Sequence, residues 1–335
     1  MRETFLGAAR GEATDRPPVW LMRQAGRYLP EYRELRSGYT FREAISTPSV
    51  ATEITLQPFE RFPLDAVVIY SDILVALEPL GIEYHLESGV GPVIDDPIET
   101  PADVPARAEP VSQRLAFVGE LLERVSDHVG DRAATLGFAG GPFTLASYAV
   151  AGEPSRNHVP VRGFKAAHPE AFSTLLETFS ELITEFLQYQ VDHGADAVQL
   201  FDTYAGLLGP EDYREYVLPH HREILSSVDV PTIVFVRNMG GRLPLLKESG
   251  ADVVGLDWTV DMAEARSVLG ETPVQGNLDP TDLMGEPAFV TERTREVIEA
   301  AGPEGHILNL GHGVDKRTPV ESVEAFVETA TSWEW

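Results

Sequence analysis

Short apolar runs rich in β-branched residues alternate with longer amphipathic stretches along the whole chain. Each run is closer to a continuous apolar run than to an alternating one, which is typical of a strand buried on both faces of a parallel sheet. The pattern predicts eight strands, at Val19–Met22, Ala66–Tyr70, Ala134–Phe138, Ala197–Phe201, Thr232–Val236, Val253–Leu256, Pro273–Gly276 and His306–Leu310.

Helical spacing fills the stretches between these runs. It is clearest over residues 169–191, where apolar residues recur at intervals of three and four. Pro169 stands at the start of this stretch and Gly194 just past its end, as expected at helix termini. Eight strands alternating with helices predict an α/β fold, a (β/α)8 TIM barrel that forms a single domain over residues 1–335.

A doubly wound open sheet is the alternative architecture. No GxGxxG sequence follows the first predicted strand, which argues against the dinucleotide-binding version of that fold. The segment 76–110 is rich in Pro, Gly and acidic residues, and we expect it to be a long loop outside the repeating units.

The charge balance of the chain is strongly acidic. There are 53 acidic and 26 basic residues, a formal charge of -27, and only Lys165, Lys247 and Lys316 are lysines. Such a surface repels itself at low salt, so we interpret the chain as adapted to the salt-rich cytoplasm of an extreme halophile. An ordinary acidic protein is the alternative. Nucleic acid is excluded as an expected partner, because phosphate backbones require a basic face.

Several kinds of chemistry are excluded by what the chain lacks. It contains no Cys, which rules out disulfides, Cys-bound zinc, iron–sulfur clusters and a thiol nucleophile. No Walker A, HExxH or GxSxG sequence occurs, and no motif demands a metal or cofactor. The N-terminus has no apolar signal region, and no run approaches 18 apolar residues. We therefore expect a cytoplasmic protein without a membrane partner.

Polar residues follow every predicted strand, where the chemistry of a barrel is expected. The groups, in chain order, are Arg23-Gln24-Ala25-Gly26-Arg27, Ser71-Asp72, Gly140-Gly141-Pro142 with Tyr148 beyond it, Asp202-Thr203-Tyr204, Arg237-Asn238, Asp257-Trp258, Asn277-Leu278-Asp279 and Gly311-His312-Gly313. Each has a purely structural interpretation as well. Asp72 suits a helix N-cap, and Tyr148 suits a core aromatic. His312, between two glycines, has little core to fill.

Arginines concentrate near the end of the first apolar run. From Arg16 to Arg42 there are six Arg and two Glu, a local balance of +4 in an acidic chain. Gly26 and Pro30 break any helix there, which predicts a loop. "PVWLMRQAGRYLPEYRE" in this region resembles the N-terminal signature of the uroporphyrinogen decarboxylase family. "YSDIL", "GGPFTLASYAV", "QLFDTYAG", "GLDWTV", "QGNLDP" and "NLGHG" continue that resemblance, in family order, over nearly the whole chain.

The resemblance implies a TIM-barrel homodimer that needs no cofactor. Members remove carbon dioxide from the four acetate side chains of uroporphyrinogen III and produce coproporphyrinogen III. Since this substrate carries eight carboxylates, the resemblance also explains the arginines, whose planar guanidinium binds a carboxylate with two parallel hydrogen bonds.

The resemblance also assigns roles to individual residues by their positions in the matching motifs. The resemblance makes Arg23 and Arg27 carboxylate-binding residues, and Arg23 is also a candidate for helping proton delivery. Asp72 resembles the aspartate that accepts hydrogen bonds from pyrrole N–H groups and stabilises a cationic ring. The other positions that match substrate contacts are Gln24, Ala25, Gly26, Tyr148, Thr203 and His312. Thr203 stands where relatives commonly have Ser, and Asp202 receives no role.

Two alternatives remain for the function. One is a corrinoid-linked methyltransferase of the same superfamily, which would need zinc held by Cys and His. The absence of Cys argues against it. The other is a non-enzymatic tetrapyrrole-binding relative, which we would expect to lack a member of the set Arg23, Arg27, Asp72, Tyr148 and His312. All five are present.

Overall fold

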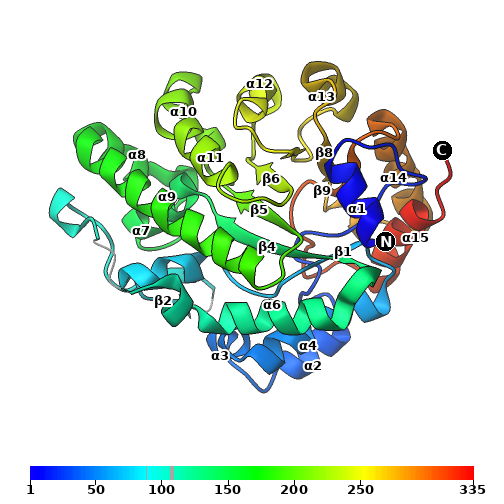
Figure 1. The fold of residues 1–335 in the computed structure, drawn as a ribbon, viewed down its shortest axis with the longest axis horizontal. Helices are drawn as coiled ribbons and strands as arrows, with labels where there is room; N and C mark the ends of the chain where they lie inside the picture. The colour runs from blue at the N-terminus through cyan, green and yellow to red at the C-terminus, as the bar shows by residue number, and fades with distance from the viewer. Residues whose placement is uncertain (88, 106–108) are drawn as a thin grey trace.

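A curled sheet of parallel strands forms the centre of the molecule (Figure 1). The structure, a computed structural model, describes residues 1–87, 89–105 and 109–335. Seven strands pair in the order β1-β4-β5-β6-β7-β8-β9. They are β1 (Ala66–Val68), β4 (Ala134–Gly140), β5 (Ala197–Phe201), β6 (Thr232–Phe235), β7 (Val253–Gly255), β8 (Val274–Leu278) and β9 (His306–Leu310). All seven were predicted, and the α/β, TIM-barrel-like class is confirmed.

The first predicted strand, Val19–Met22, is wrong as a regular strand. This segment is extended and lies between β9 and β1, but it makes a single parallel bridge, from Val19 to Leu308. Two prolines precede it, and proline cannot donate to a ladder. The N–H of Val19 instead donates to the Asp65 carboxylate at 2.8 Å, which Arg16 also holds with two hydrogen bonds of 2.8 Å. The eighth position of the ring is therefore held by this side-chain clamp together with a few backbone hydrogen bonds, such as those from Leu308 to Pro18 at 2.8 Å and from Asp65 to Val19 at 2.9 Å.

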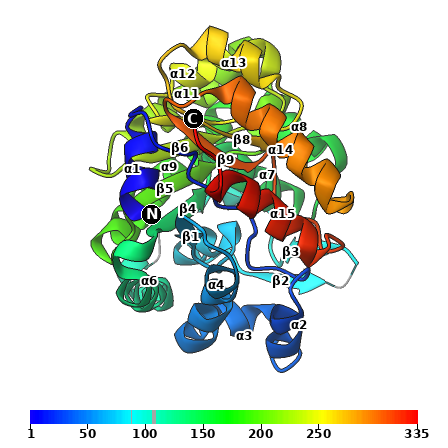
Figure 2. The same ribbon diagram turned by 90° about the vertical axis from the view of Figure 1, so that its right-hand side faces the viewer.

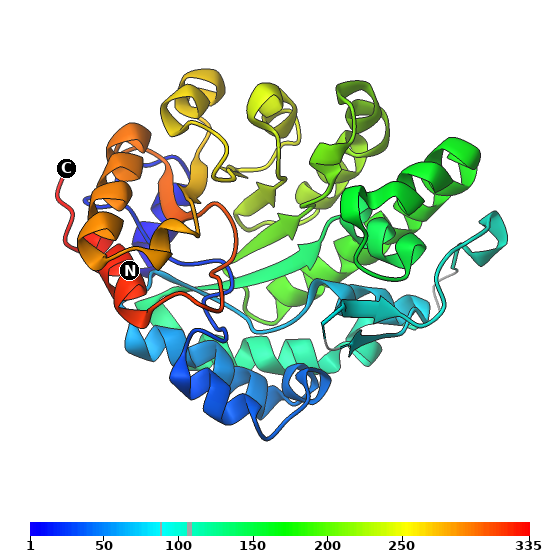
Figure 3. The same cartoon turned by 180° about the vertical axis from the view of Figure 1, so that it is seen from behind.

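Helices surround the outer side of the sheet (Figures 1 and 3). The α-helices are α1 (Arg2–Ala9), α2 (Pro30–Arg36), α3 (Phe41–Ser46), α4 (Pro48–Arg61), α5 (Val111–Arg114), α6 (Ala116–Val129), α7 (Pro142–Ala151), α8 (Val159–Ala167), α9 (Pro169–Asp192), α10 (Pro210–Tyr216), α11 (Leu218–Leu225), α12 (Leu243–Lys247), α13 (Met262–Leu269), α14 (Pro287–Ala301) and α15 (Val320–Thr331). The predicted 169–191 helix is α9. Figure 2 shows α2, α3 and α4 gathered on one side of the molecule.

Apolar side chains fill the inside of the ring, as in other barrels of this kind. Helix α1 contributes to this inner cluster, whose members are Phe5, Leu6, Ala8, Ala9, Trp20, Met22, Ala66, Ala134, Leu136, Ala197, Ile233, Phe235, Val253 and Ile307. The interior is thus a packed core, which leaves the strand ends as the place for a site.

The segment 76–110 is more ordered than the long loop that we expected from its composition. It begins within the 3-10 helix η1 (Ile73–Leu80) and continues into an antiparallel hairpin of β2 (Tyr84–Glu87) and β3 (Gly91–Ile94). A short 3-10 helix, η2 (Pro101–Asp103), follows, while residues 88 and 106–108 lie outside the described part of the chain. In the described ranges, no helix is both long and apolar enough to cross a membrane.

Candidate active site

Four of the expected site residues come together at the carboxyl ends of the strands. The charge of Arg23 acts on the ionisation of Asp72, Tyr148 and His312, which belong to three other strand-end segments. These residues are far apart in the sequence, and the parallel sheet brings them to one face. The barrel geometry therefore produces the group that the strand-end pattern predicted.

The Arg23 loop is anchored through its backbone to the end of β9. The N–H of Met22 donates to Oδ1 of Asn309 at 3.0 Å, and the Met22 carbonyl accepts from Val314 at 3.0 Å. Arg23 itself has φ 59°, a left-handed conformation that non-glycine residues rarely adopt. Its side chain lies directly over Gly313, where a Cβ would overlap Cδ of Arg23. Glycine at 313 therefore leaves the space that this arginine occupies.

The remaining residues of this loop differ in how deeply they are buried. Gln24 is fully buried, and its Nε2 atom has no hydrogen-bond partner. Ala25 packs against the core, and Gly26 is half-buried. Arg27 is exposed, and among the described residues no ion pair joins its guanidinium to the other site residues. The predicted helix break is a loop up to Leu29, after which Pro30 starts α2.

Asp72 is a helix N-cap, the structural role considered for it, and it also lies in the candidate site. Its Oδ1 atom accepts the N–H of Leu74 at 2.8 Å and so caps η1. Burial raises the pKa of Asp72, whereas the Leu74 N–H and the charges of Arg23 and Arg42 lower it. Arg42 is held nearby by two hydrogen bonds to the buried carboxylate of Glu78. The pKa of Asp72 is raised overall, so the two guanidinium groups offset the desolvation of its carboxylate only in part.

Tyr148 lies on α7 and pairs with a second tyrosine. Its hydroxyl is 3.0 Å from the hydroxyl of Tyr204. Burial raises the pKa of Tyr148 first, and the neighbouring Tyr204 and Asp72 raise it further. The phenol therefore stays protonated at neutral pH and can donate a hydrogen bond to a ligand.

Asp202 organises the buried layer beneath the two tyrosines. One carboxylate oxygen accepts both the N–H and the hydroxyl of Thr144 at 2.7 Å, and the other lies 2.9 Å from Nε2 of His221. The Thr144 hydroxyl in turn accepts the N–H of Tyr204 at 3.1 Å. Asp202, which received no role from the sequence, therefore positions α7 and Tyr204 from below.

His312 lies between two arginines. Burial lowers its pKa to about 3, together with the charges of Arg23 and Arg237, while Asp257 opposes them. The imidazole is therefore neutral at neutral pH and can form hydrogen bonds without adding charge. Its ring stacks on Trp258 with an interplanar angle of 17° and a centroid distance of 6.3 Å.

Thr203 lies beside the end of β6. It is half-buried, and its carbonyl accepts the N–H of Arg237 at 3.3 Å. Three residues without an assigned role, Tyr204, Arg237 and Trp258, thus belong to the same face. All three follow a predicted strand in the sequence, and Tyr204 and Trp258 also lie within the family motifs.

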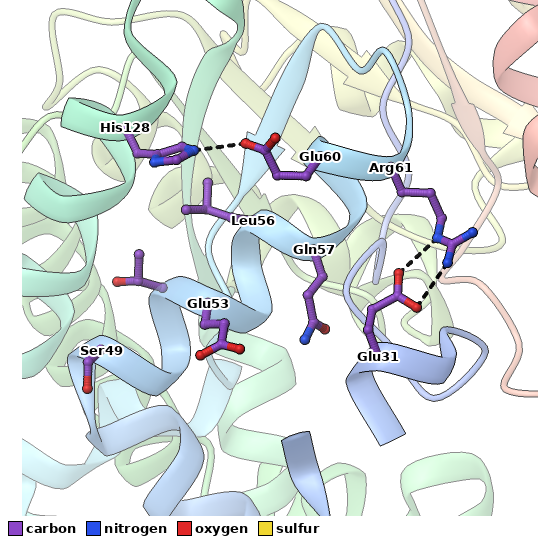
Figure 4. Close-up of a pocket in the computed structure, with 9 residues that line it drawn as sticks. Glu31, Ser49, Glu53, Leu56, Gln57, Glu60, Arg61 and His128 are labelled. Carbon is purple, nitrogen blue, oxygen red and sulfur yellow. Dashed lines mark hydrogen bonds and ion pairs between the residues drawn. The ribbon is translucent and has the colours of Figure 1, made fainter. Parts of the chain in front are cut away.

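A separate surface groove lies on the outside of the barrel, away from the strand ends (Figure 4). It is lined by side chains of α2, α4 and the end of α6. Its charged residues largely pair with one another, since Arg61 donates to Glu31 at 2.8 Å and His128 lies 2.8 Å from Glu60. At the strand-end face, Arg23 and Arg237 form no ion pair with any residue that the structure describes, so this face is the better candidate for binding an anion. Among the residues that the structure describes, no group of three or more His, Asp or Glu is placed to hold a metal ion.

Comparison with solved structures first shows the class of fold to which the chain belongs. A solved methyltransferase from Methanosarcina mazei aligns with a TM-score of 0.83 at 22% identity, covering 98% of each chain. A B12-independent methionine synthase from Shewanella sp. W3-18-1 aligns with a TM-score of 0.63 at 13% identity, covering 94% of this chain and 97% of that one. At such identities the likeness establishes the shared TIM-barrel-like fold alone.

Sequence comparison then identifies the family. The family model for uroporphyrinogen decarboxylase (URO-D) matches residues 1–333. A uroporphyrinogen decarboxylase from Gloeobacter violaceus is 46% identical over 335 residues, covering 98% of this chain and 96% of the relative. Another from Synechococcus sp. (strain JA-3-3Ab) is 45% identical, covering 98% and 92%. The chain belongs to the uroporphyrinogen decarboxylase family, as the motifs predicted.

Proposed function

We infer that this protein is a carboxy-lyase of porphyrin biosynthesis that converts uroporphyrinogen III into coproporphyrinogen III and four molecules of carbon dioxide. The observation that carries this inference is the match to the family over residues 1–333, together with relatives named as this enzyme at 42–46% identity. The family's motif residues Arg23, Asp72, Tyr148 and His312 also meet at one face of the barrel.

The arginine loop is proposed to bind the substrate carboxylates. Arg23 lies against Gly313 within the site and would hold a carboxylate next to the reacting ring. Arg27 is exposed and would meet the anionic substrate at the entrance. Gln24, Ala25 and Gly26 would line the same loop. The balance of +4 over residues 16–42 supports this role, because the chain as a whole would repel an octa-anion.

Asp72 is proposed to stabilise the cation that forms during decarboxylation. Protonation of a pyrrole carbon makes the ring cationic, so the C–COO⁻ electron pair can move toward it as carbon dioxide leaves. The exocyclic methylene then takes up a proton to become the methyl group, and the ring loses the proton it first gained. A carboxylate that accepts the pyrrole N–H is worth roughly 3–4 kcal/mol at such a charge.

The remaining substrate contacts are hydrogen-bond donors. Tyr148 keeps its phenol protonated, because burial and its neighbours raise its pKa. His312 is neutral, and Thr203 retains the hydroxyl that a serine would offer. These groups would orient the acetate and propionate side chains without adding charge, while Arg23 would assist proton delivery through its position.

Family resemblance and composition support further proposals about the protein as a whole. We expect one domain over residues 1–335, a homodimer and a cytoplasmic location. The charge of -27 with three lysines supports adaptation to high salt. Lowering KCl from molar concentrations should then lower the unfolding temperature followed by circular dichroism, whereas an unchanged temperature would contradict salt adaptation.

An anaerobic assay tests the enzymatic function directly. Uroporphyrinogen III is incubated with the protein in high KCl, without added metal and with a chelator, and oxidised products are separated by carboxyl number. Seven-, six-, five- and then four-carboxyl porphyrins are expected in succession. If a folded protein left all substrate at eight carboxyls, the chain would be a tetrapyrrole-binding relative without this activity.

A further inference from the structure

We propose that Arg237 and His312 form a second carboxylate-binding subsite, at the ends of β6 and β9, that holds one carboxylate side chain of the tetrapyrrole substrate. His312 was expected to contact the substrate, whereas Arg237 had no role. The identity of the ligand rests on the proposed function, but the binding of a carboxylate can be tested without turnover.

Arg237 is a half-buried arginine in a chain that is rich in acids. Its Nε atom is buried and has no hydrogen-bond partner in the part of the chain that the structure describes. Within residues 1–87, 89–105 and 109–335 its guanidinium forms no ion pair, although the chain has 53 acidic residues against 26 basic ones. Removing a guanidinium from water without a counter-ion is unfavourable. An anionic ligand would supply the missing partner.

The Arg237 side chain is nevertheless held in place. Its guanidinium carbon lies 4.6 Å from the centre of the Trp258 ring, a favourable cation–π position. The same indole stacks on His312. Trp258 therefore contacts both the arginine and the imidazole, and the charge of Arg237 acts on His312 as well.

The backbone around Arg237 is fixed from two sides. Its N–H donates to the Thr203 carbonyl at 3.3 Å, and the next N–H, of Asn238, donates to Asp257 at 2.5 Å. Gly206 permits this arrangement, because a Cβ at that position would overlap the Arg237 carbonyl oxygen. An arginine held before the ligand arrives loses little side-chain freedom on binding, which favours affinity.

The charges around His312 favour the binding of an anion beside it. The charged groups that act on it are Arg23, Arg237 and Asp257, two positive and one negative. The Asp257 carboxylate is already engaged, since its oxygens accept N–H groups of Thr259 at 2.8 Å and Asn238 at 2.5 Å. A substrate carboxylate would therefore meet net positive charge and a neutral imidazole that can donate its N–H.

Kinetics of three variants test the subsite. Arg237→Gln removes the guanidinium, Arg237→Lys keeps the charge, and Arg295→Gln removes the same charge from an exposed position on α14. We expect Arg237→Gln to lower kcat/KM for uroporphyrinogen III by about 10- to 100-fold, mainly through KM, as for loss of a charged hydrogen bond. Arg237→Lys should recover part of this loss, and Arg295→Gln should resemble wild type.

Titration of His312 supplies a readout that a merely structural role would not change. Its C2 proton signal is assigned with a His312→Gln variant, and the probe is the product coproporphyrinogen III, which does not turn over. Both Arg237→Gln and bound product should raise the His312 pKa, the first by removing a positive charge and the second by adding negative charge. In Arg237→Gln the product should bind more weakly.

The outcomes separate the two proposals. If wild type binds coproporphyrinogen III with the expected His312 shift but does not decarboxylate uroporphyrinogen III, the subsite stands and the proposed enzymatic function fails. If wild type is active but Arg237→Gln stays within twofold of Arg295→Gln in KM and product affinity, the subsite is refuted. It is equally refuted if Arg237→Lys recovers nothing and both Arg237 variants unfold at lower temperature than wild type.

Discussion

Replacement of Asp72 by asparagine separates the cap that this residue provides in the structure from its proposed role in catalysis. The carboxylate caps η1 through a 2.8 Å hydrogen bond from Leu74, and it is proposed to stabilise a cationic pyrrole. Asparagine retains a side-chain oxygen for the cap but has no charge. Alanine removes both. The pair of variants therefore assigns a change in stability to the cap and a change in rate to the charge.

The expected magnitudes differ for the two variants. Loss of one well-placed electrostatic group should lower kcat by about 100- to 1,000-fold, the effect of roughly 3–4 kcal/mol at the transition state. Asn and Asp are comparable N-caps, so Asp72→Asn should change the free energy of unfolding by less than ~0.5 kcal/mol. Asp72→Ala should have the same kcat as Asp72→Asn, but its free energy of unfolding should be lower by about 1 kcal/mol.

Single-turnover decarboxylation and urea unfolding measure these quantities. The single-turnover rate is compared at saturating enzyme, so that weaker substrate binding does not enter the comparison. Retention of more than about a tenth of the wild-type rate by a stable Asp72→Asn protein would refute the charge role. A slow Asp72→Asn variant that also unfolds at lower urea would instead show that the cap or its surroundings had been disturbed.

Three further predictions follow from individual contacts. Gly313→Ala should displace Arg23 and lower kcat/KM about tenfold in steady-state assays, with little change in unfolding temperature. Asp65→Ala leaves Arg16 without its buried partner and should cost roughly 3–5 kcal/mol in urea unfolding. His306 is buried with its pKa lowered from 6.5 to about 4, so below pH 6.5 only the unfolded state binds its proton. Stability should then fall by about 1.4 kcal/mol per pH unit toward pH 4, and His306→Gln should reduce that slope.

Regular strands could be predicted from the sequence because their signal is local. Continuous β-branched runs predicted β1 and β4 to β9, and helical spacing predicted α9. The Val19–Met22 run is also apolar but does not form a ladder, because Pro17 and Pro18 precede it and the Asp65 side chain takes the Val19 N–H. That competing partner is 46 residues away in the chain, so no local pattern reveals it.

The residues of the site could be predicted from the sequence, whereas the contacts between them could be predicted less well. Position after a strand, with the family motifs, located Arg23, Asp72, Tyr148 and His312. The stacking of Arg237 and His312 on Trp258 depends on which strand ends the barrel places side by side. The same holds for the buried bond between Asp202 and His221. Such non-local pairs have no periodicity in the sequence, and only the fold brings them together.

The contact that anchors the arginine loop to β9 also sets when this loop can form during synthesis of the protein. The arginine loop is anchored where the N–H of Met22 meets Asn309, a contact across 287 positions of the chain. The ribosome must therefore release almost the whole polypeptide before this loop can acquire its geometry. A nascent or C-terminally truncated chain can form the earlier strand–helix units, but its arginines stay unanchored. Assembly of the arginine loop is thus a late event that follows completion of the barrel.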